Sequence, residues 1–113
     1  MHEYSIVQAL LDRVDAEARA HGASSVGRLE VRIGELSGVD VELLHSAFLA
    51  FRDRTICAAA TLTIQPIAAR WECPHCSREI ARGSVLTCGA CGKPARLATG
   101  DEIMLDRIEM EVV

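Results

Sequence analysis

Four cysteines in two closely spaced pairs are the residues of this chain best suited to chemistry. They occur as Cys73-Pro74-His75-Cys76 and Cys88-Gly89-Ala90-Cys91, with eleven residues between the pairs. Two Cys-x-x-Cys turns at this separation are typical of a site in which four thiolates bind zinc tetrahedrally. Redox disulfides and an iron site use the same residue types, so they stay open as alternatives. The pattern therefore predicts a four-cysteine metal centre with zinc as its first candidate.

The residues around the cysteines suit tight turns that point the thiolates inward. Gly89 and Gly92 are expected to provide backbone freedom, and Pro74 is expected to stiffen the first turn. Four thiolates leave no open coordination position, so the predicted zinc is structural rather than catalytic. The segment is too small to hold a core of its own, and metal binding is therefore expected to supply its folding free energy.

A second metal-binding pattern opens the chain, at Met1-His2-Glu3. The α-amine of Met1, together with the amide nitrogen and imidazole Nδ1 of His2, can close adjacent chelate rings on one ion. Three nitrogens in this arrangement favour square-planar Ni(II) or Cu(II) over tetrahedral Zn(II). Glu3 offers a further donor, and the bulk of His2 is expected to protect Met1 from removal. Read without further context, a histidine at this position is far more often a solvated terminal residue than a ligand.

Hydrophobic periodicity predicts the helices that position these residues. Apolar side chains recur at helical spacing from Ser5 to His21, and Gly22 follows as a stop. Asp40 occupies an N-cap position before a second helix that is expected to run to about Arg54. The residues that this second helix is expected to bury are Leu43, Leu44, Ala47, Phe48 and Phe51.

Alternating polar and apolar residues predict three strands. The first covers residues 28–33, and the second covers 60–68, where Pro66 indicates a sheet edge or a strand end. A last strand is expected from about Glu102 to Val112. Its beginning, Ile103-Met104-Leu105, is apolar on both sides, which indicates either deeper burial or a bulge.

The order of these elements predicts an α+β fold. A small three-stranded sheet with two helices is expected to carry an inserted four-cysteine zinc-ribbon-like module. Residues 1–70 together with 98–113 are predicted to form the nickel-binding domain, and residues 71–97 are predicted to form the zinc-binding module.

Composition narrows the classes of partner. The chain has 113 residues and a formal net charge of −4, which gives no reason to expect nucleic acid or an acidic membrane surface. Within residues 71–97, however, four cations outweigh two acids. A zinc-ribbon module that binds nucleic acid or a protein is therefore the alternative interpretation.

The sequence also indicates in which compartment the chain is expected and whether it carries catalytic motifs. No apolar run is long enough to span a membrane, and the chain opens without a signal-peptide pattern. The fifth cysteine, Cys57, has no pairing partner, which suits a reducing compartment, so a cytoplasmic location is expected. There is no Ser-His-Asp arrangement, phosphate loop or pair of catalytic carboxylates, so we do not expect an enzyme. The remaining histidines, His21, His45 and His75, are assigned no site.

Several of these features together resemble the HypA/HybF family of nickel-insertion proteins, which are metallochaperones for the maturation of [NiFe]-hydrogenase. The features are Met1-His2-Glu3-Tyr4-Ser5, Gly34-Glu35-Leu36, Asp40 and the four cysteines, and they span essentially the whole chain. The resemblance implies Ni(II) as transferred cargo at Met1, His2 and Glu3, with Asp40 either a further contact or only the helix N-cap. It also implies structural zinc at Cys73, Cys76, Cys88 and Cys91.

The resemblance also implies a biological role. The chain would deliver nickel to [NiFe]-hydrogenase and, as in some relatives, to urease. Its partners would be the nickel-handling GTPase HypB and the precursor of the hydrogenase large subunit, without nucleic acid or membrane. The chain would be a monomer or a homodimer.

Overall fold

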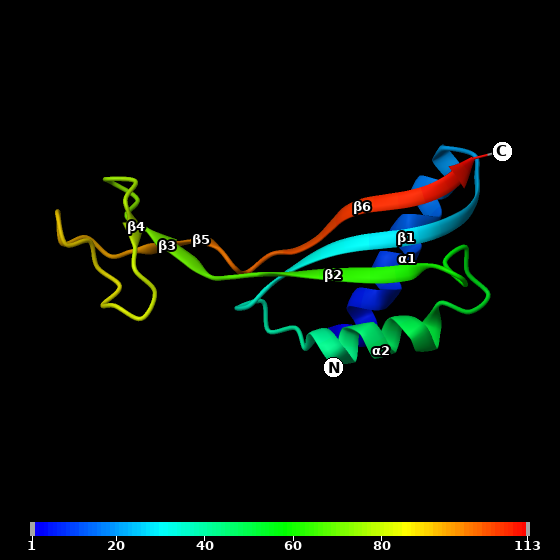
Figure 1. Cartoon of the computed structure of the whole chain (residues 1–113), viewed down its shortest axis with the longest axis horizontal. Helices are drawn as coiled ribbons and strands as arrows, with labels where there is room; N and C mark the ends of the chain where they lie inside the picture. Colours follow the sequence, from blue (N-terminus) through cyan, green and yellow to red (C-terminus); the bar gives the residue numbers. More distant parts are fainter. Residues whose placement is uncertain (1, 113) are drawn as a thin grey trace.

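The computed structural model of this protein describes residues 2–112, and at residue 2 the backbone alone. Its elements form two three-stranded sheets, one in the order β2-β1-β6 and one in the order β4-β3-β5. Figure 1 shows the sheets at opposite ends of an elongated molecule measuring 56 × 28 × 16 Å. The elements are α1 (His2–Ala20), β1 (Ala23–Gly34), α2 (Val41–Phe51), β2 (Thr61–Ile67), β3 (Arg70–Glu72), β4 (Glu79–Ile80), β5 (Arg96–Thr99) and β6 (Ile103–Val112).

The predicted α+β architecture is confirmed. The first sheet, called the main sheet below, carries both helices, and the four cysteines lie in the segments around the second sheet. We call residues 71–97 the zinc module and the remainder the main domain. This division follows the sequence-based prediction, and the second sheet itself extends from Arg70 to Thr99.

The central strand of the main sheet is β1. It pairs in parallel with β2, to which α2 is the crossover connection, and antiparallel with β6. In this register Leu29 lies opposite Leu62 on one side and Ile108 on the other. Pro66 lies in β2 at the edge of the sheet, as predicted, where its missing N–H is tolerated.

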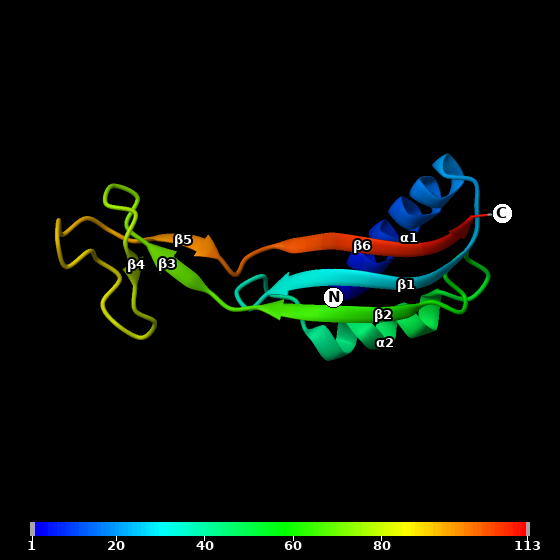
Figure 2. The same cartoon turned by 45° about the horizontal axis from the view of Figure 1, so that its top comes forward.

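Both helices cover one face of the main sheet (Figure 2). Leu29, Val31 and Ile33 of β1 point into this covered face and are at most 3 % exposed, as their alternation predicted. Arg28 and Glu30 alternate with them, and each lies 3.9 Å from an oppositely charged group on β6. The side-chain alternation of β1 therefore separates an apolar core from a charged open face.

The second helix is shorter and less covered than predicted. It ends at Phe51 rather than near Arg54, whose φ of 64° is incompatible with a continuing helix. Leu43 and Phe51 are 37 % and 48 % exposed, so the prediction that they are buried is wrong. Because the main sheet has only three strands, α2 buries just the stripe formed by Leu44, Ala47 and Phe48.

The structure makes two further expectations more exact at the chain ends. The first helix begins at His2 instead of near Ser5. In β6, the register with β1 shifts between Glu30 and Val31, whose partners are Arg107 and Leu105. Ile103 and Met104 are about half exposed. The apolar start of β6 therefore reflects a bulge rather than deeper burial.

Candidate metal centres

The thiols of Cys73, Cys76, Cys88 and Cys91 converge at the far end of the molecule. All four sulfur atoms lie within 4.8 Å of one another, and Sγ of Cys73 lies 3.5 Å from Sγ of Cys91. A tetrahedral ion with Zn–S bonds of about 2.3 Å needs sulfurs about 3.8 Å apart. The arrangement therefore fits a closed four-thiolate site for an ion of this size.

Two turns with the same hydrogen-bond pattern present these thiols. In the first, the N–H of Ser77 donates to the carbonyl of Cys73 at 2.8 Å, and the N–H of Cys73 donates to Arg78 at 2.9 Å. In the second, Gly92 donates to Cys88 at 2.7 Å, and Cys88 donates to Lys93 at 2.8 Å. The repeated pattern positions the two cysteine pairs alike, as expected of a zinc-ribbon-like module.

Each turn needs one residue with positive φ directly after its second cysteine. Gly92 fills that position in the second turn with φ of 72°, and Ser77 fills it in the first with φ of 57°. Gly89, which was expected to provide backbone freedom, is not among the described residues with positive φ. The equivalent positions in the two Cys-x-x-Cys motifs were the signal that could have identified Ser77.

The turns also prepare the thiols for a cation. The backbone N–H groups of Cys91 and Ala90 favour the thiolate of Cys88 and lower its pKa to about 6. The N–H of Cys76 lowers the pKa of Cys73 in the same way. Hydrogen bonding to Cys91 and desolvation raise the pKa of Cys76 to about 12. The backbone N–H groups thus favour the thiolate form of Cys73 and Cys88 but not that of Cys76. A bound divalent cation would supply the positive charge that stabilises all four thiolates.

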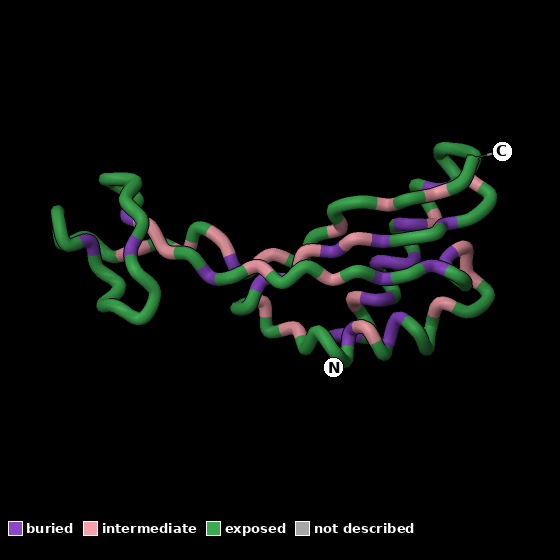
Figure 3. Tube along the Cα trace, in the orientation of Figure 1, coloured by how far each residue is buried: buried purple, intermediate pink, exposed green. Residues whose placement is uncertain are grey.

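Few side chains other than cysteine hold the zinc module together. Its buried residues are Cys73, Ile80 and Cys88, with Trp71 and Ala95 packed against them. Trp71 thus packs against a cluster that contains two of the four cysteines. Figure 3 shows how little of this end of the molecule is buried compared with the main domain. Such a small cluster supports the expectation that metal binding stabilises the module.

The second candidate centre lies at the start of α1. Met1 and the side chain of His2 lie outside the described residues. Glu3 is only 4 % exposed, and its Oε2 accepts a hydrogen bond from the backbone N–H of Asp40 at 3.0 Å. Asp40 in turn accepts the N–H of Leu43 on Oδ1 at 3.0 Å, which confirms it as the N-cap of α2. Two acidic residues far apart in sequence are thereby brought together.

The carboxylate of Glu3 is held in its ionised form. The positive N-terminus and the N–H of Asp40 lower the pKa of Glu3 to about 2. A permanent negative charge therefore lies in the first turn of α1, where it also complements the helix dipole. The same charge would attract a divalent cation to the start of the chain.

The remaining candidates give no further centre. His75 is exposed, and His21 contacts the carbonyl of Glu17 through Nδ1 at 2.8 Å. Cys57 is fully buried in the main core, and burial raises its pKa to about 11. No described helix combines the length and apolar character that crossing a membrane requires. Sequence reasoning did not single out the contact between Glu35 and Arg82, which is described below.

The chain is similar to known proteins over almost its whole length. The profile of a family described as "Hydrogenase/urease nickel incorporation, metallochaperone, hypA" matches residues 1–110. The chain is 38 % identical to the hydrogenase maturation factor HypA of Shewanella oneidensis, over 98 % of this chain and 96 % of that protein. It is 35 % identical to the corresponding protein of Aquifex aeolicus, over 99 % of both chains.

Solved structures show the same relationship. The solution structure of the Ni metallochaperone HypA from Helicobacter pylori superimposes with a TM-score of 0.75 at 32 % identity and covers both chains completely. A second solution structure of HypA protein gives a TM-score of 0.81 at 33 % identity, over 97 % of this chain and 96 % of that one. The similarity therefore includes both ends of the molecule.

Proposed function

Because the chain belongs to the HypA family of nickel-incorporation metallochaperones, we propose that it binds Ni(II) at its N-terminus and delivers it to a [NiFe]-hydrogenase. The nickel donors are the amine of Met1, the amide and imidazole nitrogens of His2, and Glu3, with Asp40 beside them. The recipient is the precursor of the hydrogenase large subunit, with urease as a second class of client. The nickel-handling GTPase HypB is the expected partner, and no catalytic step is assigned.

The observation that carries this proposal is the hydrogen bond between Glu3 and the backbone of Asp40. It joins the first turn of α1 to the start of α2, so that two acidic residues, Glu3 and Asp40, come together near the start of the chain. The carboxylate of Glu3 is ionised at neutral pH. Added negative charge at this position favours a divalent cation over an uncharged ligand.

The early start of α1 supports the same proposal. The first four N–H groups of an α-helix have no acceptor within the helix. Residue 2 is the first residue of α1, so its amide nitrogen is not needed for helical hydrogen bonding. The nitrogen can therefore release its proton to solvent and bind a metal ion without breaking the helix.

We assign zinc to Cys73, Cys76, Cys88 and Cys91 as a structural ion. A closed set of four thiolates leaves no position through which nickel could exchange with a partner. The alternative, a nucleic-acid-binding zinc ribbon, gains no support. Two of the four cations in the zinc module are already engaged, because Arg82 pairs with Glu35 and Arg96 pairs with Glu72.

The test separates the two metals. The variant His2→Ala, and a second variant with one residue added before Met1, are each expected to lose stoichiometric Ni(II) binding while retaining one equivalent of zinc. His75→Ala serves as the matched control, because His75 is an exposed histidine inside a cysteine turn and should leave nickel binding unchanged. Metal analysis and calorimetry measure both ions on untagged protein. Unchanged nickel affinity in both N-terminal variants would refute the proposal.

A further inference from the structure

Three segments of the chain meet where the two parts of the molecule are joined, and two of them connect the main domain to the zinc module. They meet at Gly34 at the end of β1, at Ala69 between β2 and β3, and at Gly100 between β5 and β6. A Cβ on Gly34 would lie 2.1 Å from the carbonyl carbon of Gly100, and a Cβ on Gly100 would lie 2.6 Å from Cα of Ala69. Only glycine allows the backbones to approach this closely. We call this point the crossing.

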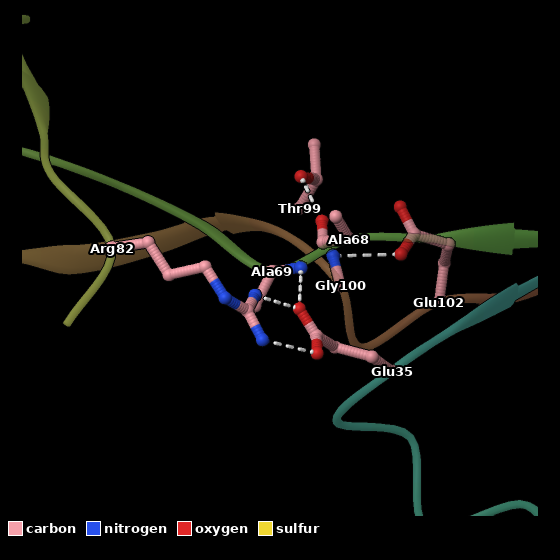
Figure 4. Close-up of polar contacts among 7 residues, drawn as sticks. All are labelled: Glu35, Ala68, Ala69, Arg82, Thr99, Gly100 and Glu102. Carbon is pink, nitrogen blue, oxygen red and sulfur yellow. Dashed lines mark hydrogen bonds and ion pairs between the residues drawn. The ribbon is translucent and has the colours of Figure 1, made fainter.

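Backbone hydrogen bonds fix the crossing itself. The N–H of Glu35 donates to the carbonyl of Ile67 at 2.9 Å, and the N–H of Leu36 donates to that of Gly100 at 2.7 Å. The links that leave the main domain are joined to each other as well. The hydroxyl of Thr99 donates to the carbonyl of Ala68 at 3.0 Å (Figure 4). The crossing is thus a well-defined anchor for both links.

The carboxylate of Glu35 makes an additional contact across the crossing, which we call the clamp. Its Oε1 accepts the backbone N–H of Ala69 at 2.5 Å and also a hydrogen bond from Nη1 of Arg82. Its Oε2 accepts Nη2 of Arg82 at 2.8 Å, so the guanidinium binds in a bidentate manner (Figure 4). The guanidinium of Arg82 and the N–H of Ala69 lower the pKa of Glu35 to about 2.

The position of Arg82 allows the clamp to restrain the zinc module. Beyond the crossing, the zinc module is attached through β3 and β5, which are neighbours in one narrow ribbon. A ribbon of two paired strands can bend and twist about its base. Arg82 follows β4 and lies off this ribbon, so it provides a third point of attachment. Among the ion pairs of residues 2–112, it is the one that joins the zinc module to the main domain.

We propose that Glu35 is the positioning residue that sets the orientation of the zinc module relative to the main sheet. With the clamp closed, the module has one orientation; with the clamp open, it pivots at the crossing while both parts stay folded. The closed clamp is accessible to solvent, since the side chains of Arg82 and Glu35 are 65 % and 34 % exposed. It can therefore be opened by ions or by a competing charged group. This inference goes beyond metal delivery and does not depend on nickel.

The test compares clamp variants with a matched ion pair. Glu35→Ala and Arg82→Ala each open the clamp. Arg96→Ala is the control, because Arg96 binds Glu72 at 2.7 Å with similar exposure, but both residues lie in the second sheet. Residual dipolar couplings are measured on the zinc-loaded full chain. One alignment tensor is expected to describe both parts of the wild type and of Arg96→Ala, and this shared tensor is expected to be lost in both clamp variants.

Salt gives a second, mutation-free arm of the same experiment. At about 1 M NaCl the screening length falls to about 3 Å, which weakens an exposed ion pair. The wild type is then expected to lose its shared tensor, whereas Arg82→Ala should not change further. Arg82→Ala also leaves the bond between Glu35 and Ala69 in place, so the test holds even where Glu35→Ala fails to fold.

Two outcomes would overturn the proposal. A single shared tensor in Arg82→Ala, with amide shifts and zinc content unchanged, would mean that the crossing alone orients the module. An equal loss of shared alignment in Arg96→Ala would mean that ion pairs in the module act through its stability and not through the clamp.

Discussion

Among the described residues, the apolar core of the main domain contains fifteen buried side chains, whereas that of the zinc module contains Cys73, Ile80 and Cys88. Full burial of a large apolar side chain contributes about 1.5–3 kcal/mol, so the main domain can be held together by its core. The zinc module has too few such residues, and its two buried cysteines belong to the metal centre. We therefore predict two sources of stability in one chain, an apolar core at one end and metal coordination at the other.

The two sources can be monitored separately. Trp71 is the only tryptophan of the chain, and it packs in the zinc module. Both helices belong to the main domain. Tryptophan fluorescence therefore reports on the zinc module, and far-ultraviolet circular dichroism reports mainly on the main domain.

The largest effect is expected from Cys73→Ser. Structural zinc contributes about 10–16 kcal/mol of apparent binding free energy near neutral pH, so losing the site should unfold the zinc module. We expect zinc to be lost and the fluorescence of Trp71 to become that of a solvent-exposed tryptophan, while the helical dichroism is retained. Cys57→Ser is the control, since it makes the same atomic change in the apolar core. Loss of helical signal in Cys73→Ser would show that the two parts do not fold independently.

Phe48→Ala is the converse change. Phe48 is fully buried in the main core, and truncation of such a residue costs about 3–5 kcal/mol. Urea unfolding followed by dichroism should show this loss, whereas zinc content stays at one equivalent. Phe51→Ala makes the same truncation where the ring is 48 % exposed and should cost clearly less. Equal costs would contradict the assignment of Phe48 to the core.

Asp40→Ala tests a smaller contribution within the main domain. Removing the carboxylate that accepts the N–H of Leu43 should cost about 1 kcal/mol. Asp40→Asn keeps a capping acceptor and should restore most of this stability, as measured by urea unfolding. Calorimetric nickel affinity of the two variants then separates the roles of Asp40. If Asn restores stability but not nickel affinity, the negative charge of Asp40 acts on the metal.

The smallest effect concerns the clamp that joins the two parts. The pKa of Glu35 is lowered from 4.5 to about 2, first by Arg82 and then by the N–H of Ala69. A lowered pKa in the folded state means that the clamp stabilises fully above pH 4.5, and that this contribution is lost as pH falls toward 2. A carboxyl NMR titration should give a pKa near 2 in the wild type and a value nearer 4.5 in Arg82→Ala. An unchanged low pKa in Arg82→Ala would remove Arg82 as the main cause.

Much of the main domain could be predicted because its signals are local. Alternation at Leu29, Val31 and Ile33 identified a half-covered strand, and Pro66 identified an edge. The periodicity placed the start of α1 near the beginning of the chain but not at His2, because the first residues of the helix precede the apolar stripe. The exposure of Leu43 and Phe51 was missed because helical periodicity shows which face is apolar, but not how far neighbouring elements extend over it.

The candidate sites divide in the same way. The spacing within each Cys-x-x-Cys turn is set by the covalent chain, so the sequence by itself determined the four-cysteine cluster. The N-terminal nitrogen donors are likewise a prediction from the sequence alone. Tertiary structure decided what those centres touch. Glu3 meets Asp40 across 37 positions, and Glu35 meets Arg82 across 47. Contacts between polar groups so far apart leave no periodic pattern, because they exist only once the two helices and the two sheets have been placed.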